Sequence, residues 1–156
     1  MNKILFLHGW FSDGSSKTFF LMSQGYKVLT PRLGNFSYKN SIKIAQKAYE
    51  EFNPDLIIGS SRGGSVALDL NVNQNVPLIL LAPAYKFFRK SSDTNHKNII
   101  VLHSKTDDLI PFKDSVEFCD KNNVKLYQAG VDHQLNCNSA KKCLKEILNK
   151  LQKPFN

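Results

Sequence analysis

The stretch Leu56-Ile57-Ile58-Gly59-Ser60-Ser61-Arg62-Gly63-Gly64 decides the fold of this chain. Its three apolar residues predict a buried strand, and the residues that follow it predict a helix. The Gly-x-Ser-x-Gly motif between them is typical of a sharp, strained turn, which lifts one serine above the carboxyl end of a parallel strand. Ser61 is therefore the predicted nucleophile. The alternative is an ordinary tight connection between a strand and a helix.

Short apolar runs alternate with longer amphipathic stretches on both sides of this motif. We expect strands at residues 3–7, 26–30, 55–58, 78–82, 98–103 and 124–128, and helices at 15–23, 41–52, 62–70, 112–122 and 138–151. The alternation predicts an α/β fold, a three-layer sandwich in which helices cover both faces of a mostly parallel sheet. The length suits one domain over residues 1–156.

The composition is that of a globular protein, with 42% apolar residues and a formal net charge of +8. No apolar run approaches the roughly 20 residues of a membrane span, and the start lacks a signal-peptide cleavage site, so we expect a cytoplasmic protein. Lysines cluster in the last helix without interleaved aromatic residues, which favours a solvated face over nucleic-acid binding. The three cysteines form no Cys-x-x-Cys pair and are expected to be buried thiols.

An acid and a base for Ser61 are expected after later strands. Asp107 lies on the loop after the fifth strand, with Asp108 as its competitor. Either acid could instead cap the helix that follows. His133 follows the last strand and is the predicted general base, and the acid would hold its ring in the correct tautomer.

Acyl transfer also requires two backbone donors for the developing oxyanion. The amide of Arg62 begins a helix and is one candidate. The amide of Trp10, on the loop after the first strand, is the second, with Phe11 as the alternative, and Gly9 lets that loop approach the substrate. The Arg62 side chain either attracts an acidic substrate or turns aside into a local ion pair.

The other histidines are expected to be structural. His8 organises the first loop, His96 lies in a polar loop, and His103 stands at the end of the fifth strand. The spacing of His8, His103 and His133 does not match a set of metal ligands, so no metal is expected. No organic cofactor is implied either.

Four segments in this order resemble the α/β-hydrolase superfamily, and in particular its small, cap-less bacterial serine esterases. They are Leu5-Phe6-Leu7-His8-Gly9-Trp10, Ile58-Gly59-Ser60-Ser61-Arg62-Gly63-Gly64, His103-Ser104-Lys105-Thr106-Asp107-Asp108-Leu109-Ile110-Pro111 and Gly130-Val131-Asp132-His133. The third segment usually reads His-Gly-x-x-Asp-x-x-Val-Pro in the family, which places the acid at Asp107, although Ser104 replaces the glycine. The resemblance implies a single, minimal α/β-hydrolase domain with six parallel strands, no lid and an open site.

The resemblance and the residues together predict a serine hydrolase that cleaves small carboxylic esters through an acyl-enzyme. A thioesterase or small peptidase with the same triad, and a non-catalytic hydrolase-like binding protein, stay open as alternatives. The expected partner is a small-molecule ester, and the sequence leaves the oligomeric state open. An apolar acyl pocket is expected from Phe11, Tyr85 and Phe87, with Trp10 and Phe88; packing in the core or in a loop is the alternative for these side chains.

Overall fold

A single parallel sheet organises the computed structural model, which describes residues 1–152. The strand order is β2-β1-β3-β4-β5-β6, and every neighbouring pair is parallel. The strands are β1 (Lys3–Leu7), β2 (Lys27–Leu29), β3 (Leu56–Ser60), β4 (Leu78–Leu81), β5 (Ile99–His103) and β6 (Lys125–Gln128). The helices are α1 (Ser15–Ser23), α2 (Tyr38–Phe52), α3 (Arg62–Leu68), α4 (Tyr85–Phe88), α5 (Phe112–Asn122) and α6 (Asn138–Gln152). The predicted fold class is confirmed.

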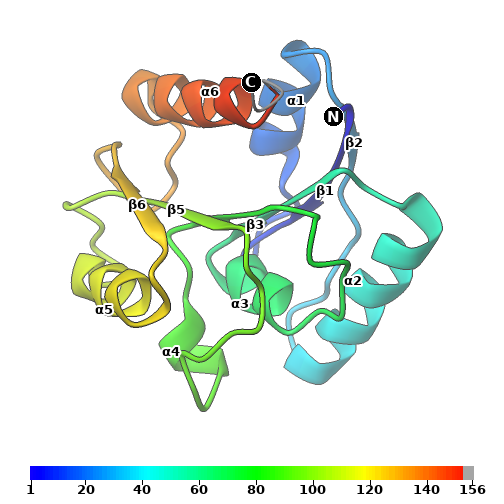
Figure 1. Ribbon diagram of the computed structural model, residues 1–156, viewed down its shortest axis with the longest axis horizontal. Helices are drawn as coiled ribbons and strands as arrows, with labels where there is room; N and C mark the ends of the chain where they lie inside the picture. The colour runs from blue at the N-terminus through cyan, green and yellow to red at the C-terminus, as the bar shows by residue number, and fades with distance from the viewer. Residues whose placement is uncertain (153–156) are drawn as a thin grey trace.

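Helices cover both faces of the sheet, and the pleat of each strand divides its apolar side chains between them. Figure 1 shows α1 and α6 on one side and the other four helices on the opposite side. In β1, Leu5 and Leu7 belong to the core under α2 and α3, while Ile4 and Phe6 belong to the core under α1 and α6. Successive side chains of a strand point to opposite faces, so a strand buried on both sides is apolar throughout.

The element boundaries differ from the predicted ones at a few ends. α2 begins at Tyr38 rather than residue 41, because the Ser37 hydroxyl accepts a hydrogen bond from the Asn40 amide and caps the helix. α3 ends at Leu68, two residues early. The short helix α4 was not predicted, since four residues are too few for a periodic pattern.

After β1 the chain adds β2 on one side of this strand and then returns to add β3 on the other side. This reversal determines where the site lies. The loop after β1 and the turn after β3 therefore leave the same edge of the sheet side by side. In open α/β sheets, ligands bind in the crevice at this kind of reversal.

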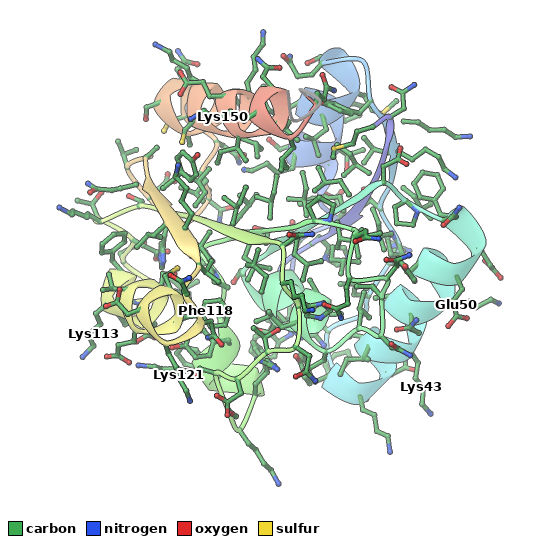
Figure 2. The ribbon with its side chains drawn as sticks, in the orientation of Figure 1. Lys43, Glu50, Lys113, Phe118, Lys121 and Lys150 are labelled. Atoms are coloured by element: carbon green, nitrogen blue, oxygen red, sulfur yellow. The ribbon has the colours of Figure 1, made fainter. Side chains whose placement is uncertain are left out.

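Charged side chains cover the outside of the molecule. Figure 2 shows Lys43 and Glu50 of α2, and Lys113 and Lys121 of α5, directed outward, whereas Phe118 lies between α5 and the sheet. Phe118 is fully buried. The lysines are thus distributed over several elements, as expected of solvated helix faces.

The cysteines depart from their prediction. Cys119 is buried, but Cys137 and Cys143 are partly exposed, so the expectation of three buried thiols is wrong for two of them. Cys137 precedes α6 and Cys143 lies within it, and both pack against the edge of the core under this helix without being enclosed by it. Across residues 1–152, no helix combines the length and the apolar character that crossing a membrane would require.

Candidate active site

Ser61 lies at a strained turn between β3 and α3. Its φ of 53° and ψ of −116° are unusual for a residue with a side chain. A Cβ atom at Gly59 would stand 2.5 Å from the Gly63 carbonyl oxygen, and one at Gly63 would stand 2.0 Å from the Leu7 carbonyl oxygen. The two glycines are therefore needed because backbone packs directly against backbone on both sides of the serine.

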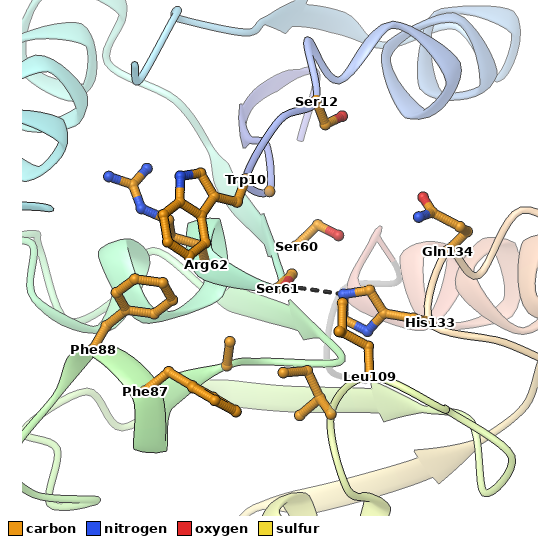
Figure 3. A pocket seen from close by; sticks show the side chains of 13 residues that line it. Trp10, Ser12, Ser60, Ser61, Arg62, Phe87, Phe88, Leu109, His133 and Gln134 are labelled. Carbon is orange, nitrogen blue, oxygen red and sulfur yellow. Dashed lines mark hydrogen bonds between the residues drawn. The ribbon is translucent and has the colours of Figure 1, made fainter. Parts of the chain in front are cut away.

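The structure brings Ser61, His133 and Asp107 into one chain of hydrogen bonds. His133 Nε2 lies 2.9 Å from Ser61 Oγ, across 72 positions of sequence, and this contact is the dashed line in Figure 3. His133 Nδ1 lies 2.7 Å from Asp107 Oδ2. Asp108 is exposed and makes no contact with the ring. Of the two candidate acids, Asp107 is thus the one beside His133.

The Asp107 carboxylate is fully buried and accepts four hydrogen bonds. Oδ1 accepts from the amides of Leu109 and Ile110, both at 2.8 Å, while Oδ2 faces two imidazoles. Burial alone raises the pKa of Asp107, but the hydrogen bonds from His133, Ile110 and Leu109 outweigh it and lower the pKa below its ordinary value. The group is therefore an anion at neutral pH.

His103 is the second imidazole at Asp107, a contact that sequence reasoning missed. Its Nε2 lies 2.9 Å from Asp107 Oδ2 and its Nδ1 lies 2.7 Å from Ser115 Oγ. The side chain is fully buried, and burial lowers its pKa. The signal in the sequence is the spacing of four residues between His103 and Asp107 across a tight turn, which brings the two side chains to the same loop.

Two backbone amides beside Ser61 donate to no group within residues 1–152. They belong to Trp10 and Arg62. The amide of Phe11, the alternative donor, is occupied because it donates to Asn35 Oδ1 at 3.2 Å. A Cβ atom at Gly9 would lie 3.4 Å from Ser61 Cβ, so the loop after β1 rests directly against the serine.

The Arg62 side chain turns away from the site, but it forms no ion pair within residues 1–152, so the prediction of a local ion pair is wrong. One guanidinium nitrogen donates to the Gly34 carbonyl at 3.1 Å and another donates to Ser41 Oγ at 2.7 Å. The guanidinium also lies over the rings of Tyr38 and Phe88, at 5.8 and 5.6 Å from their centroids. Neutral acceptors and aromatic faces thus hold a cation that is 2% exposed.

A pocket of about 470 Å³ opens beside Ser61. Figure 3 shows Trp10, Phe87 and Phe88 on one side of Ser61, and Leu109 and His133 on the other. The remaining lining residues are Gly9, Ser12, Ser60, Arg62, Ala84, Ile110 and Gln134. The pocket is thus mainly apolar, with the Ser61 hydroxyl exposed in its wall.

Two of the predicted pocket residues lie elsewhere. Tyr85 is buried in the core, where its hydroxyl donates to the Asp114 carbonyl and its ring packs against Phe118. Phe11 is 77% exposed and stacks on Trp10 outside the pocket, because its left-handed backbone turns it outward. Phe87, the third predicted residue, does line the pocket. Sequence reasoning missed Leu109 and Ile110, although they sit directly beside the predicted acid.

The loops around the site are held by two further buried side chains. His8 Nδ1 donates to the Gly9 carbonyl at 2.8 Å and its Nε2 accepts from the Leu33 amide at 3.1 Å, so neither ring nitrogen remains for Ser61. Lys17 donates to the carbonyls of Gln134 and Leu135 and to Asn136 Oδ1, which belong to three consecutive residues after His133. No group of three or more potential ligand side chains among residues 1–152 is arranged to hold a metal ion.

Comparison with known proteins identifies the fold through solved structures alone. No family model matches the sequence, and no curated protein matches it significantly. Solved structures do match. The ydeN gene product of B. subtilis is similar over 98% of this chain and 100% of its own, with a TM-score of 0.78 and 14% identity.

Two further structures extend the likeness. Alpha/beta hydrolase domain-containing protein 10 from mouse is similar over 96% of this chain and 90% of its own, with a TM-score of 0.71 and 15% identity. The esterase domain of a Rhodothermus marinus protein is similar over 96% and 85%, with a TM-score of 0.67 and 17% identity. At such identities the likeness concerns the fold, and the chain described here has the α/β-hydrolase fold.

Proposed function

We propose that this protein is a serine hydrolase that cleaves small carboxylic esters through an acyl-enzyme intermediate. The observation that carries the proposal is the unbroken contact from Ser61 Oγ through His133 to the buried Asp107 carboxylate. A serine hydroxyl is a weak nucleophile unless an oriented base accepts its proton, and this arrangement supplies both the base and the group that orients it.

In the acylation step, Ser61 Oγ attacks the ester carbonyl while His133 Nε2 takes its proton. The Asp107 carboxylate keeps the Nδ1 proton of His133 in place and stabilises the imidazolium that forms. The carbonyl oxygen becomes an oxyanion, and the amides of Trp10 and Arg62 are the donors available to it. Each such donor contributes on the order of 3 kcal/mol to the transition state.

The alcohol then leaves with the proton that His133 returns to it. A water molecule attacks the acyl-enzyme, again with His133 as base, and releases the carboxylic acid and Ser61. Among the described residues that line the pocket, none presents a free charge, because Gly34 and Ser41 engage the guanidinium of Arg62. The proposed acyl group is therefore uncharged and apolar.

A fluorophosphonate probe tests the nucleophile. The wild type should be labelled, and Ser61→Ala should abolish labelling and ester hydrolysis together. Ser65→Ala is the matched control, since this buried serine of α3 lies outside the pocket and its hydroxyl has no partner within the described residues. Labelling that persists in Ser61→Ala, or a folded wild type that is never labelled, would refute the proposal.

The leaving group is tested separately. Nitrophenyl esters, acyl-CoA thioesters and aminoacyl amides with the same acyl group are compared through kcat/KM. We expect the esters to have the highest kcat/KM of the three substrate classes. A higher kcat/KM for the thioester or for the amide would assign the protein to the thioesterases or to the peptidases, with the same triad chemistry.

A further inference from the structure

The Asp107 oxygen that contacts His133 also contacts a second histidine, His103. Asp107 Oδ2 lies 2.7 Å from His133 Nδ1 and 2.9 Å from His103 Nε2. A carboxylate only accepts hydrogen bonds, so both ring nitrogens must donate to it. One oxygen atom therefore serves two imidazoles.

The tautomer of His103 is determined by its other contact. Its Nδ1 lies 2.7 Å from Ser115 Oγ, and this hydroxyl can donate to it. A neutral ring that donates from Nε2 accepts at Nδ1, so the two contacts agree. Burial opposes a charge on His103, whose side chain is fully enclosed.

Within residues 1–152, the charged or titratable groups that act on His103 are Asp107 and His133. Helix α5 packs over the ring through Phe112, at 5.6 Å between centroids, and through Ser115. Asp114 of the same helix is paired with Lys86 instead. Of the described residues, Asp107 and His133 are thus the titratable groups that His103 faces.

We infer that His103 is a positioning residue, which shares Asp107 Oδ2 with His133 and so keeps His133 a weaker base than it would be beside an unshared carboxylate. The inference rests on the proposed role of His133 as the general base. The amides of Leu109 and Ile110 donate to Oδ1 of Asp107 and hold the carboxylate in place. The hydrogen bond from His103 therefore changes the charge available at Oδ2 rather than the position of the carboxylate.

The consequence for the reaction concerns how strongly Asp107 favours a proton on His133. A buried carboxylate that serves one histidine strongly favours its protonated form, and a protonated His133 cannot take the Ser61 proton. Donation from His103 withdraws part of that stabilisation. The shared carboxylate therefore favours the protonated form of His133 less than an unshared one would.

The test compares His103→Phe with His103→Gln. Phenylalanine keeps a ring against Phe112 but cannot donate to Asp107, whereas the glutamine amide can. We expect His103→Phe to raise the pKa of His133 by about 1 unit, and His103→Gln to stay within about 0.3 units of wild type. His96→Phe, on a loop outside the site, is the matched control and should leave the titration unchanged.

Two readouts keep this inference separate from the proposed function. Heteronuclear NMR of the imidazole nitrogens follows the titration of His133 without any substrate. If ester hydrolysis is present, the acid limb of the kcat/KM profile should move by the same amount, so that His103→Phe loses up to about 10-fold below the limb and little on the plateau. A uniform loss at every pH would indicate a merely structural role and overturn the inference.

If the variants fail to fold, NMR of the wild-type protein alone still tests the inference. NMR should find His103 neutral at neutral pH, with the proton on Nε2. A proton on Nδ1, or a charged His103 at neutral pH, would overturn the inference. So would an unchanged or lowered pKa of His133 in His103→Phe, or a His103→Gln variant that titrates like His103→Phe.

Discussion

Gly63 packs against the end of β1 so closely that a Cβ atom there would stand 2.0 Å from the Leu7 carbonyl oxygen. The helix after Ser61 and the strand that leads to the Trp10 amide therefore meet backbone to backbone. This contact brings the nucleophile and the proposed oxyanion donors into one unit. A side chain at position 63 would separate them.

Gly63→Ala should therefore be strongly destabilising. Neither backbone can move without breaking β1 or α3, so we expect the free energy of unfolding to fall by at least about 3 kcal/mol in urea titration. Gly25→Ala is the control: it has a φ of 90° but no atom within 4 Å of its Cβ position, and its cost should be only about 1–2 kcal/mol of backbone strain. Equal costs for the two variants would contradict this account.

Arg62→Leu should affect stability more than catalysis. The change removes two hydrogen bonds, to Gly34 and Ser41, and keeps the backbone amide. We expect a loss of about 2–4 kcal/mol in the free energy of unfolding and a kcat/KM within about 10-fold of wild type. Arg32→Leu, at an exposed position, should change stability by less than about 0.5 kcal/mol. A large loss of kcat/KM with full stability would instead give the guanidinium a role in binding substrate.

Phe87→Ala should shorten the preferred acyl chain. Phe87 lines the pocket although it is 67% exposed, so its ring should contact the far part of a longer acyl group. In a series of nitrophenyl esters, kcat/KM for hexanoate should fall about 10-fold more than kcat/KM for acetate. Phe36→Ala removes a fully exposed ring outside the pocket and should leave the series unchanged. A uniform fall across all chain lengths would argue against acyl binding at Phe87.

Lys17 fastens the loop that follows His133. Its ammonium group donates to the carbonyls of Gln134 and Leu135, at 2.7 and 2.9 Å, and to Asn136 Oδ1 at 2.6 Å. Burial lowers the pKa of Lys17 to about 8, with a smaller contribution from Lys141. The folded state therefore releases this proton at lower pH than the unfolded state does.

The sign of the pH dependence follows from this difference. Below about pH 8 both states carry the charge, and the folded state bears the cost of burying it; between about pH 8 and pH 10.5 only the unfolded state keeps the proton, so stability rises with pH. Relative to Lys17→Met, the wild type should gain about 3 kcal/mol over this interval. Lys142→Met, at an exposed position, should show no such trend. A flat or falling difference would mean that the three oxygens stabilise the ammonium more than burial opposes it.

Much of the site was predictable because its signals are local. Ser61 stands between a strand and a helix, with glycines at the two positions where side chains do not fit, and this pattern is complete within a few residues. His133 and Asp107 follow strand ends, and all strand ends of a parallel sheet meet at one edge. Their catalytic roles remain predictions, but their meeting place follows from the sheet.

The failures concern the directions of individual side chains, two of which depend on distant partners. Tyr85 and Phe11 were expected in the pocket, yet α5 draws one into the core and a left-handed backbone turns the other outward. Arg62 was expected in an ion pair, and found aromatic faces and neutral acceptors instead. The partners of Tyr85 and Arg62 are far away in sequence, so no local pattern could indicate them, whereas Phe11 is turned outward by its own backbone conformation.

The amino-acid sequence by itself determined the parallel sheet, the strained turn at Ser61 and the edge at which reactive residues gather, because periodicity and backbone sterics act over short segments. Only the tertiary structure decided that Asp107 Oδ2 faces two imidazoles, and that the Trp10 amide, rather than that of Phe11, has no acceptor among the described residues. A carboxylate oxygen and an amide each have few hydrogen-bonding positions, and which groups occupy them depends on how separate loops pack together.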